Sequence, residues 1–484
     1  MTSLKSNVIT GVKWSALSRG FVALAQLLQV AVVARFVCKD DFGLIGVALL
    51  VNSFCSIFVD MGLAAAAMHE QNLSTRQFAS FYWFNVLLGL LLTIVVSMSS
   101  PWVAAYYHRD ELMGIISVTS LVIFFQSIFS LQRTLQQKKM NFRFMALVDI
   151  SAAAVLFCSN LLLAFNGYGV FSLAYSSLLS SVFSAVVYLW YAIFRERNIL
   201  FHFDFKEVHK ALKIGIYQVG SSTLDFFSRE MDSLIISSGY TMELFGVYSL
   251  CKQLTFRVYV VINPIITNVL TPAFAQIQNN KAKVSDSYIK TINILGFLNF
   301  PLYSIIAYAS LSILTILYGE SYSEYAYLLA FLAFFYAFQS CGNPVGSLLV
   351  ALGRTDKGFY WTLFRIGFTS IYLYVASRCS FEIFAFLVFL MAFFTMYPSW
   401  LIMLKSLINV SFWDNFMLTM KPFSLCLILS PLYYLDQVID NPWLSVFVIA
   451  SFFILGYVLL NRMLRKGMWQ TIVTMVESNI KQVK

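Results

Sequence analysis

The sequence is poor in charge. Asp, Glu, Lys and Arg together make up 12% of its 484 residues, whereas a soluble globular chain usually carries about one quarter. Hydrophobic residues make up 59%, and the mean hydropathy is +0.75. No hydrophilic run is long enough for a soluble domain, since the longest weakly apolar segments, near 195–210 and 275–290, span only about 15 residues each. These shortages exclude a soluble protein and predict an all-α polytopic membrane protein.

A metal-ligand pattern is also missing. The seven cysteines are scattered without a CxxC pair, and of the four histidines only His202 and His209 lie near each other, at a spacing that favours no metal. Most of the cysteines fall in apolar stretches, where they behave as small hydrophobic residues. We therefore expect no disulfide framework, no metal site and no cofactor, apart from Na+ or H+ as a coupling ion.

Long apolar stretches are what the sequence does contain. We count about fourteen of roughly 18 to 28 residues, the length of a helix that crosses a bilayer. They lie near 11–36, 42–67, 78–100, 112–132, 145–166, 169–193, 211–238, 244–273, 289–318, 323–351, 358–377, 382–404, 420–436 and 443–462. The chain is therefore expected to lie almost entirely in or beside the membrane.

Lys and Arg are distributed unevenly between the predicted loops. Most of the 33 fall on one side of the membrane, and few, such as Arg35, Lys39, Arg109 and Arg378, fall on the other. Because loops rich in Lys and Arg stay in the cytoplasm, we expect both termini to be cytoplasmic. The net charge of +10 follows from this topology and from anionic inner-leaflet lipid, so it does not indicate a nucleic-acid partner.

The two halves of the sequence resemble each other. A shift of about 200 residues pairs Phe42-Gly43-Leu44 with Phe245-Gly246-Val247 and the first predicted span with the seventh. The polar positions that coincide are Ser15 with Gln218, Arg19 with Ser222, Gln26 with Arg229, Gln29 with Asp232 and Asp60 with Asn263. Because six spans separate the copies, both enter the membrane from the same side, which predicts a pseudo-twofold axis along the membrane normal.

This repeat predicts four parts of the chain. Residues 1–194 form a first lobe of six helices, and residues 211–405 form a second lobe of six. Residues 195–210 link them as a cytoplasmic segment that mixes phenylalanines with basic residues and lies along the membrane interface. Residues 406–484 hold two further helices, which lie outside the repeat, and a cytoplasmic tail.

The seventh predicted span carries an unusual concentration of charge. Asp225, Arg229, Glu230 and Asp232 lie in the middle of a membrane-length segment, where each costs roughly 2.5 to 3.5 kcal/mol on insertion scales. At about 100° per residue, Gln218, Asp225, Arg229 and Asp232 share one face of a helix. The spacing of Arg229 from Asp225 and Asp232 also suits same-helix ion pairs. Arg229 is therefore either a binding residue or neutralised by its neighbours.

Several short motifs carry a resemblance to a known family. In the first half they are ARFVCKDDFGLIGVALL, DMGLAA from Asp60, and LQQKKMNFRFMALVDI. In the second half they are DSLII from Asp232, FGVY from Phe245, LTPAFA from Leu270 and LGR from Leu352. In this order and spacing the sequence resembles the bacterial polysaccharide and lipid-linked oligosaccharide flippases of the multidrug/oligosaccharidyl-lipid/polysaccharide exporter superfamily, especially the colanic-acid exporter-like branch.

The resemblance implies two six-helix lobes in a V shape around a central cationic cavity. It also implies a flippase of the bacterial cytoplasmic (inner) membrane that moves an undecaprenyl-pyrophosphate-linked oligosaccharide repeat unit from the cytoplasmic to the periplasmic leaflet, by alternating access, for surface polysaccharide or lipopolysaccharide biosynthesis. The expected partners are this glycan, the bilayer and other polysaccharide-assembly membrane proteins, and the expected state is a monomer. The sequence departs from relatives at Cys251-Lys252, so the coupling ion is not carried over.

A pyrophosphate crossing hydrocarbon needs fixed positive charge along its route. The cations within predicted spans that we expect to bind substrate are Arg19, Arg229, Lys252 and Arg257, with the polar residues Gln26 and Gln218 beside them. For Arg19 the alternative is that its side chain extends to the cytoplasmic interface. We expect Arg365 to extend to the interface in this way.

Three carboxylates are candidates for ion coupling: Asp60, Asp225 and Asp232. A carboxylate in a cavity of low dielectric constant can bind and release a proton, or can bind Na+ together with hydroxyl and carbonyl oxygens. A pairing with arginine would instead keep Asp225 or Asp232 ionised. For Asp60 a structural capping role in the DMGLAA element is the alternative.

Two other functions compete with a flippase. A drug or cation antiporter of the same fold should line its cavity with acids and aromatic residues rather than with arginine. A membrane-embedded glycan polymerase or ligase would need a catalytic loop outside the membrane, and the predicted outer loops are short. The sequence therefore favours a transporter of an anionic substrate over an enzyme.

Overall fold

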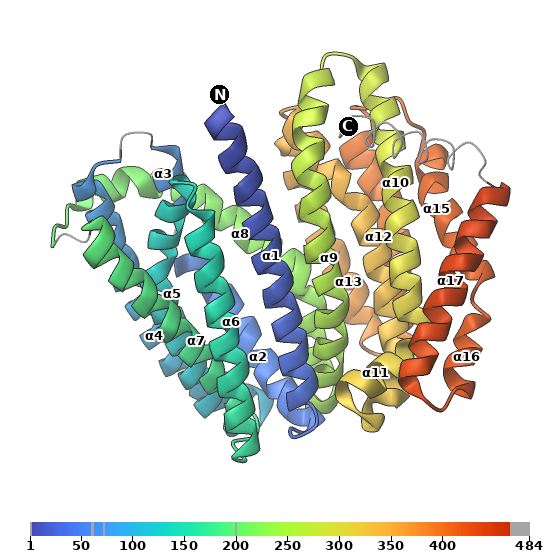
Figure 1. Cartoon of the computed structure of the whole chain (residues 1–484), viewed down its shortest axis with the longest axis horizontal. Helices are drawn as coiled ribbons and strands as arrows, with labels where there is room; N and C mark the ends of the chain where they lie inside the picture. Colours follow the sequence, from blue (N-terminus) through green and yellow to red (C-terminus); the bar gives the residue numbers. More distant parts are fainter. Residues whose placement is uncertain (1, 60–61, 71–72, 199–200, 465–484) are drawn as a thin grey trace. The chain divides into compact units, whose positions relative to one another are not determined.

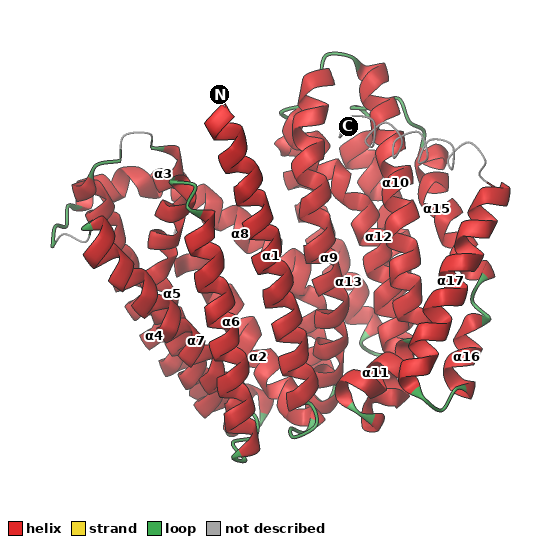
Figure 2. Ribbon diagram, viewed as in Figure 1, coloured by secondary structure: helices red, strands yellow, loops and turns green. Residues whose placement is uncertain are grey.

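The computed structural model describes residues 2–59, 62–70, 73–198 and 201–464. All regular elements over these residues are helices (Figure 2). The α-helices are α1 (Thr2–Val33), α2 (Lys39–Val59), α3 (Leu63–His69), α4 (Thr75–Tyr107), α5 (Glu111–Lys138), α6 (Phe142–Phe165), α7 (Phe171–Tyr191), α8 (Phe205–Gly239), α9 (Met242–Ile277), α10 (Lys281–Tyr308), α11 (Ser310–Tyr318), α12 (Ala326–Ala351), α13 (Thr355–Ala376), α14 (Phe381–Ser399), α15 (Phe412–Ile428), α16 (Leu432–Val438) and α17 (Pro442–Leu464). Short π-helical or 3-10 segments are η1 (Ala192–Glu196), η2 (Glu320–Tyr325) and η3 (Trp400–Leu404).

Each expected span overlaps at least one of these helices. Among the described residues, 9 helices are long and apolar enough to cross a membrane, or up to 10 if α15 and α16, which are bent by 41°, form one span. In α1 the apolar stretch found among the described residues is Leu17–Val33, which is shorter than a full span. The all-helical membrane fold is confirmed, whereas the number of fourteen crossings stays a prediction.

Two expected spans are broken in the structure. The segment near 42–67 is α2 followed by the separate short helix α3, because Gly62 adopts a left-handed backbone conformation with φ 73°. The segment near 289–318 is α10 followed by α11, and the break lies at Ala309. The break at Gly62 was not expected, whereas Pro301 within the segment near 289–318 predicts a bend or break there.

The surface of α4 is typical of a helix that faces lipid. Leu91, Val95, Met98 and Trp102 are exposed and form an apolar stripe. The opposite face buries small and polar residues that contact α5. Asn85 Nδ2 donates to the Ser127 carbonyl at 2.9 Å, and Thr93 Oγ1 donates to the Ser120 carbonyl at 3.1 Å. Gly89 lies against the Ser127 side chain. Large apolar residues outside and small polar residues between helices are what packing within a bilayer favours.

By their packing, the described residues fall into two compact units. The first holds residues up to 250 together with 362–378, and the second holds 251–361 and the residues from 379 onward. Helix α8 and most of α13 thus belong to the first unit, and α9 continues from one unit into the other. The lobe boundaries predicted from the repeat stay a prediction.

The two copies of the repeated Phe-Gly element pack against each other in the first unit. A Cβ atom on Gly43 of α2 would lie 2.2 Å from the Met242 carbonyl oxygen, and one on Gly246 of α9 would lie 2.1 Å from the Lys39 carbonyl oxygen. Lys39 and Met242 occupy the same position in the two copies, so the contact is symmetric. Lys39 Nζ also lies 3.3 Å from Glu243 Oε1. Glycine is required at both positions because backbone meets backbone there.

The core of the second unit is apolar and rich in aromatic residues. Tyr288 and Leu348 belong to a buried cluster contributed by α9, α10, α12, η3 and the segment that follows η3. Farther along α10, Phe300 packs with Phe338 of α12 and Phe423 of α15, at ring-centroid distances of 5.0 and 5.8 Å. This packing fixes α10, α12 and α15 to one another.

Candidate functional site

Helix α8 presents the predicted polar face. The helix begins at Asp204, whose side chain accepts a hydrogen bond from the Lys206 amide at 2.8 Å and so caps the first turn. Gln218, Asp225 and Arg229 are exposed, and Asp232 is half-buried. Two of the four charged residues that membrane insertion disfavours, Asp225 and Arg229, thus lie where a polar ligand can reach them.

The charges on α8 have partners within the first unit. Arg229 Nε donates to the main-chain carbonyl of Asp225 at 3.4 Å. Asp232 Oδ2 accepts from the hydroxyl of Tyr248, a fully buried residue of α9, at 2.5 Å. Asp232 is therefore held by a neighbouring helix, whereas Asp225 stays exposed.

Arg365 of α13 also acts on α8. Its Nε donates to Ser228 Oγ at 2.5 Å, and its Nη2 donates to the Ser228 carbonyl at 3.0 Å. Its guanidinium group thus finds acceptors on a neighbouring helix, and the expectation that Arg365 extends to the membrane interface stays a prediction. Ser228 directly precedes Arg229, so this contact holds α8 at the point where its charges lie.

A second group of charges surrounds Asp149 of α6. Arg133 of α5 donates from Nη2 to Asp149 Oδ2 at 2.8 Å. Arg19 of α1 is exposed and lies close enough for its charge to act on Asp149. Figure 1 shows α1 and α6, which pack together, beside each other. Our sequence reasoning missed Arg133 and Asp149, although an aspartate within an apolar span was a signal for both.

The remaining predicted residues are placed as follows. Gln26 lies on α1 two turns beyond Arg19 and is half-buried. In the second unit, Lys252 is buried on α9, and Arg257 is half-buried near Tyr318. Asp60 lies outside the described residues. Convergence of Lys252 and Arg257 with the charges of α1 and α8 on one cavity stays a prediction.

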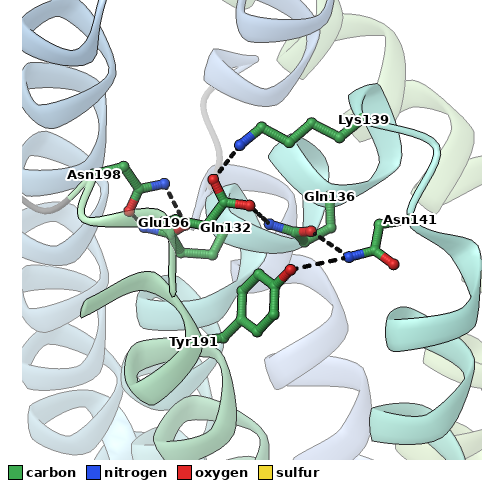
Figure 3. Close-up of polar contacts among 7 residues, drawn as sticks. All are labelled: Gln132, Gln136, Lys139, Asn141, Tyr191, Glu196 and Asn198. Atoms are coloured by element: carbon green, nitrogen blue, oxygen red, sulfur yellow. Dashed lines mark hydrogen bonds and ion pairs between the residues drawn. The ribbon is translucent and has the colours of Figure 1, made fainter. Parts of the chain in front are cut away.

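A polar network ties together the ends of α5, α6 and α7 (Figure 3). Gln132 and Asn198, both buried, exchange amide hydrogen bonds at 3.1 and 3.4 Å. The other contacts join Gln136 with Glu196, Lys139 with Glu196, and Asn141 with both Gln136 and Tyr191. Because few of these groups face water, the network holds the first unit rigid at this end and fixes where the linker toward α8 begins.

No group of three or more His, Cys, Asp or Glu residues that could hold a metal ion occurs within residues 2–59, 62–70, 73–198 and 201–464. The functional groups here are instead cations and carboxylates on membrane-length helices. Such intramembrane charges mark the pathways of transported ions and substrates. The fold and these charges therefore define the class as a polytopic membrane transport protein.

The chain belongs to the family described as polysaccharide biosynthesis proteins, whose family model matches residues 32–327. It is 27% identical over 366 residues to the lipopolysaccharide biosynthesis protein WzxC of Escherichia coli (strain K12), covering 75% of this chain and 74% of the relative. It is 25% identical over 362 residues to the teichuronic acid biosynthesis protein TuaB of Bacillus subtilis (strain 168), covering 75% and 74%.

Among solved structures, the fold is similar to that of the lipid II flippase MurJ in an inward closed conformation. The TM-score is 0.73, with coverage of 95% of this chain and 99% of that one, at 14% sequence identity. At this identity the likeness shows the fold alone. The family match and the two relatives confirm the expected kinship with bacterial polysaccharide biosynthesis proteins.

Proposed function

We propose that this protein is a flippase for an undecaprenyl-pyrophosphate-linked oligosaccharide repeat unit. It moves this lipid from the cytoplasmic to the periplasmic leaflet of the bacterial inner membrane by alternating access, for surface polysaccharide biosynthesis. The observation that carries the proposal is the set of arginine side chains, Arg19, Arg133 and Arg229, on helices of a chain in the polysaccharide biosynthesis family.

The chemistry of the substrate fits these residues. A pyrophosphate is a polyanion whose transfer through hydrocarbon is prohibitive without compensating charge. Guanidinium groups bind phosphate oxygens through paired hydrogen bonds and stay charged at every physiological pH. Exposed Gln218 and half-buried Gln26 add neutral hydrogen-bonding groups that suit sugar hydroxyls. The lipid tail would remain in the bilayer throughout.

The remaining parts of the proposal concern orientation, partners and coupling. Both termini are cytoplasmic, the protein acts as a monomer, and it works beside other polysaccharide-assembly membrane proteins. Lys252 and Arg257 line the same route. Asp225, Asp232 and Asp60 are the groups for Na+ or H+ coupling, and exposed Asp225 is the most accessible of those described.

A small-molecule antiporter of the same fold is the main alternative. Its cationic substrates would be repelled by Arg19 and Arg229. Deleting the gene in its host and measuring both surface polysaccharide and drug sensitivity separates the two functions. Loss of polysaccharide with unchanged drug sensitivity supports the flippase, and the reverse pattern supports the antiporter.

Substitutions test the cationic residues directly. Arg19→Ala and Arg229→Ala should each abolish most export in the complemented deletion strain, while Arg19→Lys and Arg229→Lys retain part of it. Arg354→Ala is the matched control, because Arg354 is exposed and pairs only locally with Asp356 at 2.9 Å. Full export by folded Arg19→Ala and Arg229→Ala variants would overturn the proposal.

A further inference from the structure

Asp149 is a carboxylate that is bound by one arginine from a neighbouring helix and influenced by the charge of a second. Its side chain is 23% exposed and accepts a hydrogen bond from Arg133 of α5 at 2.8 Å. The charge of Arg19 on α1 acts on the same carboxylate. The carboxylate lies about two turns, or roughly 10 Å, from the start of α6, a depth that a lipid phosphate can reach from the leaflet surface.

A third arginine lies on the same pair of helices. The Arg143 guanidinium carbon lies 5.8 Å from the centroid of the Trp14 ring, so it joins the start of α6 to α1. These are the two helices that carry Arg19 and Asp149, and Arg143 lies about one and a half turns before Asp149 along α6. Arg133 and Arg19 act on one carboxylate, so an excess of positive charge remains that favours an anion.

A buried hydroxyl beside this group indicates a further hydrogen-bonding position. Tyr188 of α7 is 2% exposed, and its hydroxyl has no hydrogen-bond partner among the described residues. The charges of Arg133 and Asp149 both act on this hydroxyl. The ring is fixed against Phe129 and Phe144, at centroid distances of 5.9 and 5.4 Å. Buried hydroxyl groups normally have partners, and an anion bound to Arg133 would supply an acceptor.

We propose that Asp149 is an internal counter-ion that occupies Arg133 and Arg19 in the empty protein and is exchanged for the phosphate groups of a lipid-linked pyrophosphate. The inference rests on the proposed function and assigns Arg133 and the Tyr188 hydroxyl to the phosphate site. Carboxylate and phosphate oxygens offer a guanidinium group the same acceptor geometry, so one replaces the other without rearrangement of the arginines.

The counter-ion explains how a strong site can also release its ligand. Cations that are left without a partner away from water are unfavourable, so Asp149 stabilises the empty site. Because it competes for the same donors, it also weakens phosphate binding, and a transporter needs a ligand that leaves as well as enters. An ion pair whose only role is to join α5 to α6 would neither stabilise an empty phosphate site nor weaken the binding of phosphate.

Binding of farnesyl pyrophosphate to the purified full-length protein tests this inference. Asp149→Asn should bind the probe about tenfold more tightly than the unsubstituted protein, because the competing carboxylate is gone while its volume is kept. In the same preparation Arg133→Gln should bind it more weakly. The matched control is Asp356→Asn, because Asp356 is exposed and pairs with Arg354 rather than with Arg133 or Arg19. This variant should leave the affinity for the probe unchanged.

Tyr188→Phe gives a second test that does not depend on the folding of the Asp149 variant. It removes only a hydroxyl that lacks a partner, so thermal stability should be kept while affinity for farnesyl pyrophosphate falls several-fold. Unchanged affinity in Tyr188→Phe would overturn the assignment of the hydroxyl. If Asp149→Asn binds farnesyl pyrophosphate no more tightly than the unsubstituted protein does, the counter-ion role is overturned.

One further outcome distinguishes a failure of this inference from a failure of the proposed function, and another distinguishes the pyrophosphate carrier from bilayer phospholipid as the ligand. If the unsubstituted protein does not bind farnesyl pyrophosphate at all, the proposed function itself fails. If vesicles of phosphatidylglycerol displace the probe as well as unlabelled farnesyl pyrophosphate does, the site binds bilayer phospholipid, which contradicts its assignment to the pyrophosphate carrier. Displacement by the pyrophosphate alone supports the inference.

Discussion

At the scale of single residues, the main feature is how charged side chains are accommodated in apolar helices. Asp232 accepts from the Tyr248 hydroxyl, Arg365 donates to Ser228, and Asp149 accepts from Arg133. In each case the partner comes from a different helix. Each charge therefore fixes two helices to each other while its own desolvation cost is reduced.

The hydrogen bond from Tyr248 to Asp232 should be measurable as stability. Tyr248→Phe removes the donor at 2.5 Å and leaves a half-buried carboxylate with one fewer bond, at a cost of about 1.5 to 3 kcal/mol. Thermal unfolding of the purified protein in detergent measures this loss. Tyr217→Phe is the control, since Tyr217 is 82% exposed. Equal unfolding temperatures for the two variants would show that the Asp232 bond is not stabilising.

Arg365 should be a positioning residue for the charged face of α8. Arg365→Gln removes both donors to Ser228 in their observed geometry, so we expect a large loss of polysaccharide export with only a small drop in unfolding temperature. Ser228→Ala keeps the carbonyl acceptor and should lose less. Arg378→Gln, which removes an exposed arginine of the same α13 region that contacts Tyr374, should export normally. Normal export by Arg365→Gln is the result that contradicts this role.

At the scale of helices, the symmetric contact between α2 and α9 leaves no room for a side chain. In Gly43→Ala or Gly246→Ala the new Cβ would lie 2.2 or 2.1 Å from a carbonyl oxygen, so the two helices must move apart. We expect each variant to lose about 1 to 3 kcal/mol of stability, seen as a lower unfolding temperature. Gly20→Ala, on an open face of α1, should be neutral or stabilising. Similar behaviour of all three variants would contradict a tight contact.

The charged face of α8 could be predicted because it depends on spacing along a single helix. Gln218, Asp225 and Arg229 share a face at 100° per residue, and the structure exposes all three. The partners of Asp149 and Arg365 could not be predicted in this way, because they lie on other helices. The break at Gly62 was also missed, since a glycine within an apolar run is as typical of a continuous helix as of its end.

At the scale of the whole molecule, the distribution of Lys and Arg predicts which loops face the periplasm. The exposed native cysteines Cys38 and Cys379 lie beside Lys39 and Arg378, in loops assigned to the periplasmic side. A membrane-impermeant maleimide added to spheroplasts should therefore label both. Labelling only after the membrane is permeabilised would reverse the topology.

The central claim is that the protein moves a pyrophosphate-linked glycan between leaflets, and reconstitution into liposomes tests it most directly. The substrate is placed in one leaflet, and its appearance in the other is followed by the access of an added glycan-cleaving enzyme. We expect rapid, protein-dependent exposure, lost in Arg229→Ala and retained in Arg354→Ala. Exposure no faster than in liposomes without protein would contradict the claim.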